Sequence, residues 1–283
     1  MLKLLPLLFL GLCFNALAQS PCVSGDCENG FGKYITSGGD VYEGNFKKGL
    51  FDGQGKIVLK NKEIIEGNWI KGLPINGNLI FSNGDKYVGE IADYNPQGKG
   101  KYLYKNGNIY EGYFAKGKCS GKGNFLFSDG RRYTGDFLFG NIYGKGTLTY
   151  PNGNVYTGDF IDGMAQGEGV FKSKLGTYSG KWFKDKYNGK GVYQYANGDV
   201  YSGDWVNGYC HGLGTCSYKN GNKYIGSYIQ GKKAGKGKWI SRDGTVYDGN
   251  FDHGVKDGDG FITYPNGEKQ RVTFKDDILI RRY

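Results

Sequence analysis

The sequence predicts an all-β protein, built as an elongated antiparallel meander of about ten tandem β-hairpin repeats of 23 residues each. Three observations lead to this prediction. A tyrosine returns at an almost constant interval, apolar and polar residues alternate after it, and Asn-Gly or Asp-Gly pairs separate the copies. Alternation with period two is typical of strands with one buried face, and Asn-Gly between such strands is a strong hairpin signal.

The first residue of each repeat is tyrosine in all copies but one. Successive copies are 23 residues apart, or 22 at two places. The equivalent residues are Tyr42, Ile65, Tyr87, Tyr110, Tyr133, Tyr156, Tyr178, Tyr201, Tyr224 and Tyr247. We therefore assign residues 42–267 to ten repeats. Residues 19–41 form an N-terminal segment with half a repeat, and residues 268–283 form a C-terminal cap or tail, because end repeats are often atypical.

Glycines and aromatic residues occupy fixed positions in the repeat. The third and fourteenth residues are glycine in every copy, the twelfth is glycine in all but one, and the fifth is apolar. Three consecutive repeats carry this pattern in Tyr110, Gly112, Phe114, Gly121, Gly123, Tyr133, Gly135, Phe137, Gly144, Gly146, Tyr156, Gly158, Phe160, Gly167 and Gly169. Positions one, three and five share one face of a strand. We expect the glycines on that face to leave the space that neighbouring rings need.

Two kinds of short turn are expected. Between repeats, pairs such as Asn106-Gly107 should form hairpin turns in which both residues have positive φ. Within a repeat, the loop over residues 117–121 contains its own glycines. The repeats that begin at Ile65 and Tyr156 depart from the pattern, and we expect only local irregularities in their turns.

Residues 1–18 have the pattern of a signal peptide. Lys3 gives a short positive region, residues 4–14 form an apolar run too short to span a bilayer, and residues 16–18 form a small-x-small cleavage site. No later stretch is apolar enough to cross a membrane. We expect an exported protein that is periplasmic, envelope-associated or secreted.

The cysteines predict one disulfide. Removal of Cys13 with the signal peptide leaves five cysteines, so at least one thiol is free or paired between molecules. Export permits disulfides. Cys22 and Cys27 share the short segment before the repeats and form the best candidate pair, and Cys210 and Cys216 form a weaker one.

The consensus Tyr-x-Gly-x-aromatic-x-x-Gly-x-x-x-Gly-x-Gly resembles the MORN (membrane occupation and recognition nexus) repeat. A clean instance begins at Tyr156 and ends at Gly169. The resemblance implies a twisted ribbon of hairpins with little contact between distant repeats. Families that share the repeat use it mainly to bind proteins or membranes, or to hold assemblies together. Some members attach it to a lipid kinase or lysine methyltransferase domain, which we do not expect here.

We find no motif for catalysis, a cofactor or a metal. His211 and His253 fall within the loop inside a repeat and have no Ser or Cys partner at motif spacing. The recurring Gly-Lys-Gly triplets belong to the repeat and do not open a helix, as a phosphate-binding loop would. A tyrosine-lined groove acting on glycans is the enzymatic alternative, but packing already explains the tyrosines. We therefore expect a protein that is not an enzyme.

We expect a non-enzymatic exported scaffold that mediates protein–protein or envelope-surface interaction. Its partner should be a protein, with no role for nucleic acid. The alternative is binding of anionic membrane lipid or a polyanion through basic loops, since the net charge is +10. The competing interpretation is that the lysines only make the surface soluble. The lysines considered are Lys47, Lys48, Lys116, Lys118, Lys232, Lys233, Lys236 and Lys238.

Overall fold

Every regular element that the structure describes is a β-strand. The computed structural model describes residues 21–283, so the predicted signal peptide lies outside the described residues. The strands confirm the all-β class and the tandem hairpin repeats. The chain divides into an N-terminal unit that ends at Ser82 and a C-terminal unit that begins at Asn83. Within residues 21–283, no helix has the length and apolarity of a bilayer span.

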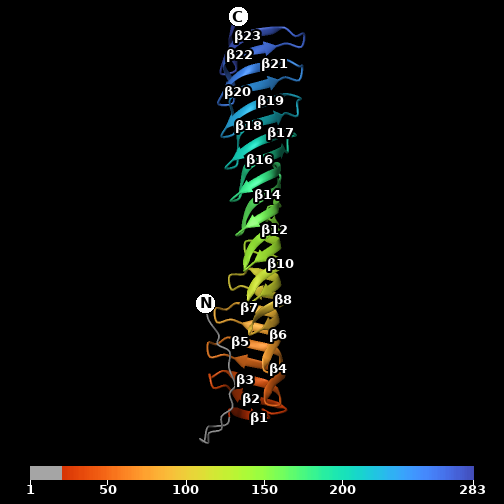
Figure 1. Ribbon diagram of the computed structural model, residues 1–283, viewed down its shortest axis with the longest axis vertical. Coiled ribbons are helices and arrows are strands. Elements are labelled where there is room, and N and C mark those ends of the chain that lie inside the picture. Colours follow the sequence, from red (N-terminus) through yellow and green to blue (C-terminus); the bar gives the residue numbers. More distant parts are fainter. Residues whose placement is uncertain (1–20) are drawn as a thin grey trace. The chain divides into compact units, whose positions relative to one another are not determined.

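In the N-terminal unit, each strand pairs antiparallel with the next one along the chain (Figure 1). A disulfide joins Cys22 to Cys27. The repeat that begins at Ile65 still forms a hairpin, with a local irregularity of register between Asn68 and Trp69. The strands are β1 (Cys22–Gly25), β2 (Phe31–Ile35), β3 (Val41–Lys47), β4 (Leu50–Val58), β5 (Ile64–Ile70) and β6 (Leu73–Ile80).

The C-terminal unit is likewise an antiparallel meander, of eight repeats and a last hairpin that follows them. Its first strands are β7 (Lys86–Ala92), β8 (Asn95–Leu103), β9 (Ile109–Ala115), β10 (Lys118–Leu126), β11 (Arg132–Leu138), β12 (Asn141–Thr149), β13 (Val155–Ile161), β14 (Met164–Ser173) and β15 (Gly176–Phe183). The others are β16 (Lys186–Tyr195), β17 (Val200–Val206), β18 (Tyr209–Ser217), β19 (Lys223–Ile229), β20 (Lys232–Ile240), β21 (Val246–Asp252), β22 (Val255–Thr263), β23 (Lys269–Lys275) and β24 (Ile278–Arg282).

One face of the sheet carries the aromatic core. The ring of Tyr110 meets Phe114 of its own strand and Phe137 of the next repeat edge to face, at centroid distances of 5.0 and 4.8 Å. Tyr133 makes the same two contacts, with Phe137 at 5.3 Å and Phe160 at 5.1 Å. Each tyrosine therefore links its own repeat to the following one through preferred ring geometry.

The glycines lie beneath the tyrosine rings. Gly112 and Gly123 are cross-strand partners, and a Cβ on Gly112 would lie 2.6 Å from Gly123 Cα. A Cβ on Gly123 would lie 2.6 Å from the Cζ atom of Tyr110. The hydroxyl of Tyr110 donates to the carbonyl oxygen of Tyr113 at 2.9 Å, which holds the ring flat over this glycine pair. Both glycine positions follow from the space that one ring occupies.

The two-residue turns with positive φ lie within the repeats. Lys116 and Gly117, which connect β9 to β10, have φ values of 50° and 75°. Gly121 has φ of 65° and lies inside β10, at a shift of register between Cys119 and Gly123. The expected loop over residues 117–121 is thus a tight turn followed by a β-bulge, because the strand resumes at Lys118.

The turns between repeats differ from the prediction. In the turn after β8 only Gly107 has positive φ, at 89°. Its N–H donates to the carbonyl oxygen of Tyr104 at 2.9 Å, which gives a type I turn followed by a left-handed glycine. Asn106 stays right-handed because its side-chain oxygen accepts the N–H of Asn108 at 3.0 Å. The expectation of positive φ at both residues of the pair was wrong.

Candidate interaction groove

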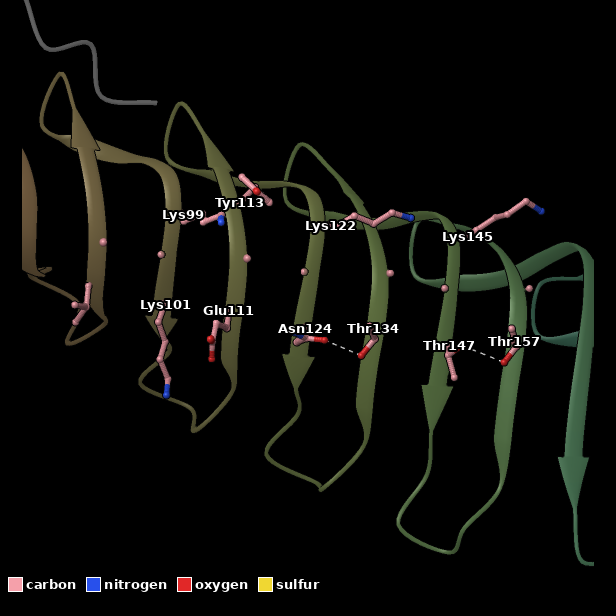
Figure 2. Close-up of a pocket in the computed structure, with 18 residues that line it drawn as sticks. Lys99, Lys101, Glu111, Tyr113, Lys122, Asn124, Thr134, Lys145, Thr147 and Thr157 are labelled. Carbon is pink, nitrogen blue, oxygen red and sulfur yellow. Dashed lines mark hydrogen bonds between the residues drawn. The ribbon is translucent and has the colours of Figure 1, made fainter.

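The face opposite the aromatic core carries an open groove of about 1040 Å³ in the C-terminal unit, across β7 to β13 (Figure 2). Its floor is a row of glycines that pair in register from strand to strand. These are Gly89, Gly100, Gly112, Gly123, Gly135, Gly146 and Gly158. The groove therefore runs across the strands, and each wall is a row of side chains that flank the glycines.

One wall is mostly neutral and polar. The hydroxyl of Thr134 donates to the side-chain oxygen of Asn124 at 2.8 Å, and the hydroxyls of Thr147 and Thr157 lie 3.1 Å apart. Figure 2 shows these side chains in a row along one side of the groove. The full row consists of Val88, Lys101, Glu111, Asn124, Thr134, Thr147 and Thr157.

The other wall is basic. Lys99, Lys122 and Lys145 occupy the thirteenth position of three successive repeats. Lys122 lies 2.7 Å from a carboxylate oxygen of Asp136, and Lys145 lies 2.8 Å from one of Asp159. The lysine side chains are 71% and 79% exposed, and both aspartates are 34% exposed. The ammonium groups are therefore open to a ligand although each already has one carboxylate partner.

The ion pairs fix the charges of this wall. The hydrogen bond from Lys122 holds the pKa of Asp136 below its usual value, and that from Lys145 does the same for Asp159. The hydrogen bond to Asp159 raises the pKa of Lys145. The wall begins with Lys99, whose Nζ lies 5.6 Å from the ring centroid of Tyr113.

A smaller groove of about 600 Å³ continues on the same face over later repeats. There Glu168 takes the thirteenth position, where Lys145 stands one repeat earlier. Leu213 and Ile225 give this second groove an apolar lining. The row of basic side chains at one-repeat spacing thus ends at Lys145.

The recurring Gly-Lys-Gly triplets were the signal in the sequence for the basic wall. From the pattern alone, the triplets belong to the repeat and have no further role. The two glycines of each triplet lie on the aromatic face of the sheet. Because side chains alternate between the two faces of a strand, the central lysine points to the opposite face. The triplets centre on Lys99, Lys122, Lys145, Lys190 and Lys236.

The lysines proposed for anionic surfaces lie in different settings. Lys48 and Lys116 occupy turns, and Lys236 lies within β20 on the face of the grooves. The expected loop position of Lys233 was wrong. Its side chain lies on the aromatic face, with Nζ 4.4 Å from the ring centroid of Trp239, because the tenth residue of the repeat pairs with the buried fifth residue. Burial among these rings lowers the pKa of Lys233.

The two histidines also lie apart. His211 is part of β18, where it pairs with Asp204, so its expected loop position was wrong. His253 occupies a turn, and its Nδ1 lies 2.8 Å from Asp252. Among the described residues, no group of three His, Cys, Asp or Glu side chains is placed to hold a metal ion.

Cys210 and Cys216 are free and buried, so the weaker disulfide prediction was wrong. Both lie on β18 and face the aromatic core, where they pair with Trp205 and Tyr201. Their partners are four residues apart on β17, because the bulge of β18 takes up the extra residues. The Cα atoms of the two cysteines are therefore roughly 13 Å apart, beyond the reach of a disulfide. Cys119 is a third free and buried thiol.

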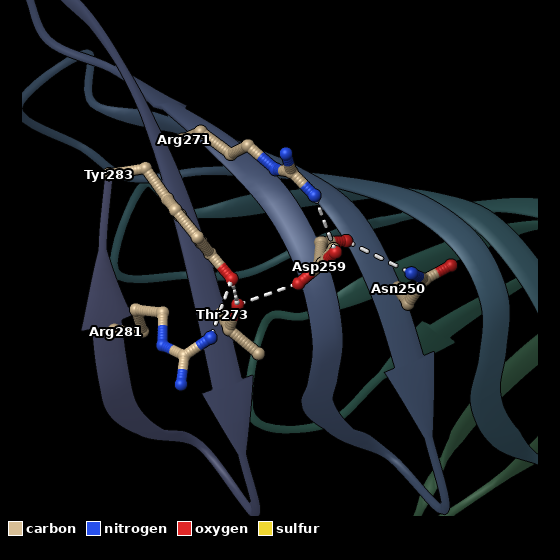
Figure 3. Close-up of polar contacts among 6 residues, drawn as sticks. All are labelled: Asn250, Asp259, Arg271, Thr273, Arg281 and Tyr283. Atoms are coloured by element: carbon tan, nitrogen blue, oxygen red, sulfur yellow. Dashed lines mark hydrogen bonds and ion pairs between the residues drawn. The ribbon is translucent and has the colours of Figure 1, made fainter.

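A polar cluster lies at the end of the C-terminal unit (Figure 3). Asp259 accepts hydrogen bonds from Arg271 at 3.0 Å and from Thr273 at 2.6 Å, and these contacts lower its pKa. Tyr283 lies 3.3 Å from the hydroxyl of Thr273 and accepts from Arg281 at the same distance. The cluster connects β22, β23 and the residue after β24, which indicates a structural role.

The model of the MORN repeat family matches nine segments of the chain and omits the repeat that begins at Ile65. The matched segments are residues 42–62, 87–109, 110–131, 133–155, 156–174, 178–200, 201–223, 224–246 and 247–269. None of the curated proteins matches the chain.

Two solved structures are similar to parts of the chain. The TCP10 domain of Danio rerio CPAP is 15% identical, with a TM-score of 0.41 over 73% of this chain and 98% of that domain. The SAS-4 TCP domain of Drosophila melanogaster, in complex with a proline-rich motif of Ana2, is 14% identical. Its TM-score is 0.28 over 74% of this chain and 96% of that one. Neither likeness bears on the activity or the partner of this chain.

Proposed function

The chain belongs to the MORN repeat family, and from this premise we propose that it is an exported, non-enzymatic scaffold that binds a partner protein through the groove over β7 to β13. The observation that carries the proposal is the regular basic wall beside the glycine floor. Lys122 and Lys145 present exposed ammonium groups at the same position of successive repeats. A surface that repeats its chemistry in this way suits an extended partner.

Export rests on the pattern of residues 1–18, and the disulfide between Cys22 and Cys27 agrees with an oxidising compartment. Detection of a mature protein that begins at Gln19 in the envelope or culture medium of the host would support export. A full-length protein in the cytoplasm would contradict it.

Site-specific photo-crosslinking in the native host tests the binding surface. A photoreactive residue at Thr147, in the groove, should join the chain covalently to one protein that mass spectrometry identifies. The same residue at Phe139, which is 74% exposed in a turn, serves as the matched control. The adduct should be absent at Phe139 and should decrease in a chain that also carries Lys122→Glu and Lys145→Glu.

Three results would each contradict a part of this function. Equal crosslinking at Thr147 and Phe139 would mean that the groove is not the contact surface. Recovery of anionic vesicles or polyanions alone, with binding lost at high salt, would favour surface adsorption through scattered lysines instead. Turnover on a panel of hydrolase substrates would contradict the proposal that the chain is not an enzyme.

A further inference from the structure

The width of the groove limits what can lie in it. Its walls stand on residues two positions apart in a strand, such as Glu111 and Tyr113 on either side of Gly112. Residues at i and i+2 of a strand are roughly 6.6 Å apart. An α-helix with side chains is about 10 to 12 Å wide, so it would rest on the rims and not reach the floor. A thinner extended chain can lie closer to the glycine floor, with only the side chains along one of its edges entering between the walls.

The direction of the groove sets the period that a ligand must match. The groove crosses the strands, and its chemistry returns once in each repeat, which is every second strand. Two strands span about 9.6 Å. A β-strand ligand presents equivalent side chains about every 6.7 Å and falls out of step within one repeat. A polyproline-II helix makes one three-residue turn in about 9.3 Å and stays in step.

From this match we propose that the groove binds a polyproline-II segment of a partner protein with an acidic residue at every third position. The acidic residues would meet Lys99, Lys122 and Lys145, which stand one repeat apart. Each ammonium has three N–H donors, and the ion pairs of Lys122 and Lys145 with aspartates use one of them. The proposal rests on the groove being the binding surface of the proposed function.

The neutral wall complements the backbone of such a ligand. A polyproline-II helix has no internal hydrogen bonds, so its carbonyl oxygens remain free to accept. On that side Thr134 already donates to Asn124, whose side-chain NH2 group lines the groove. Thr147 and Thr157 share one hydrogen bond, so one hydroxyl proton of this pair is left to donate to a ligand carbonyl oxygen. The basic row ends where Glu168 replaces lysine, so the recognised segment covers three turns, or about nine residues.

The test uses the full chain and the labelled peptide (Glu-Pro-Pro)₃, with Kd measured by fluorescence anisotropy. We expect saturable binding that weakens with salt. The double variant Lys122→Glu/Lys145→Glu should raise Kd by about tenfold or more, because two attractive contacts become repulsive. The control is Lys118→Glu. It reverses the charge of one lysine in the same way, but this lysine lies on β10 outside the groove. The control should change Kd less than about twofold. Circular dichroism verifies that each variant is folded.

The period is tested with a peptide of the same composition whose glutamates stand at alternate positions. It should bind more weakly, since its charges do not follow the spacing of the lysines. The proposal would be overturned if the two peptides bound with equal affinity or if binding did not saturate. It would also be overturned if Lys118→Glu changed Kd as much as the charge reversal of a groove lysine. If crosslinking at Thr147 still captures one protein while the peptide fails, the proposed function stands and the polyproline-II ligand is wrong.

Discussion

The ring of Tyr133 lies against the backbone of Gly146, its neighbour on the next strand. The hydroxyl of Tyr133 donates to the carbonyl oxygen of Asp136 at 3.0 Å, and a Cβ built on Gly146 would lie 2.5 Å from the Cζ atom of the ring. Equivalent contacts recur in other repeats, for example between Tyr201 and Gly214. The stability of the sheet therefore depends on glycine wherever a tyrosine covers the strand.

Gly135→Val should destabilise the protein by about 3 kcal/mol, at the upper end of the usual cost of overpacking. A Cβ at this position would lie 2.5 Å from Gly146 Cα and 2.6 Å from the carbonyl oxygen of Lys145, and neither backbone atom can move freely. Thr134→Val, on the groove face, should cost less than about 1 kcal/mol, since it loses one exposed hydrogen bond to Asn124. Equal losses in chemical unfolding would contradict the assignment of the two faces.

Tyr228→Phe should stabilise the protein by about 1 kcal/mol. The hydroxyl of Tyr228 is buried and has no hydrogen-bond partner among the described residues, so its removal relieves a desolvation cost. Tyr224→Phe on the same strand should instead destabilise by about 1 kcal/mol, because the Tyr224 hydroxyl donates to the carbonyl oxygen of Ser227 at 3.0 Å. Urea unfolding of the two variants should give shifts of opposite sign, and shifts of the same sign would refute this account.

The protein should lose stability as the pH rises from 10 to 12. Burial raises the pKa of Tyr42, Tyr87, Tyr133 and Tyr224 from 10.0 to about 12. Above pH 10 the unfolded chain releases these protons while the folded chain keeps them, so the stabilisation present below pH 10 disappears as the pH approaches the folded-state value. Tyrosinate absorbance should therefore rise together with loss of circular dichroism. Gradual ionisation of the folded protein would contradict the burial of these hydroxyls.

The thiols of Cys119, Cys210 and Cys216 should resist labelling in the native protein. All three are buried, and burial raises the pKa of Cys210 to about 12, so little reactive thiolate forms near neutral pH. Mass spectrometry should find no thiol adduct on them before denaturant is added and three adducts afterwards. A disulfide-linked peptide containing Cys210 and Cys216 would contradict the placement of both residues along one strand.

Part of the candidate site could be predicted from the sequence. Period-two alternation places Thr134 and Asp136 on the face opposite Tyr133 and Phe137, and the structure has them there. The groove itself was missed, because its basic wall depends on which lysines align across strands. Lys122 pairs with Asp136 in register, whereas Lys233, only two residues from a Gly-Lys-Gly triplet, turns toward the rings. A shift of one residue in strand register moves a side chain from the groove face of the sheet to the aromatic face.

The sequence by itself determined the class of fold and the length of the repeat, because tyrosine and glycine recur at distances that only paired short strands satisfy. Only the tertiary structure decided the turn geometry and the bulge at Gly121. The same holds for the separation of Cys210 from Cys216 and for the alignment of Lys99, Lys122 and Lys145 along one wall. The physical reason is that the alternation of apolar and polar residues predicts the face of the sheet on which each side chain lies. The residue that lies opposite on the next strand depends on turns and bulges, because these shift the register.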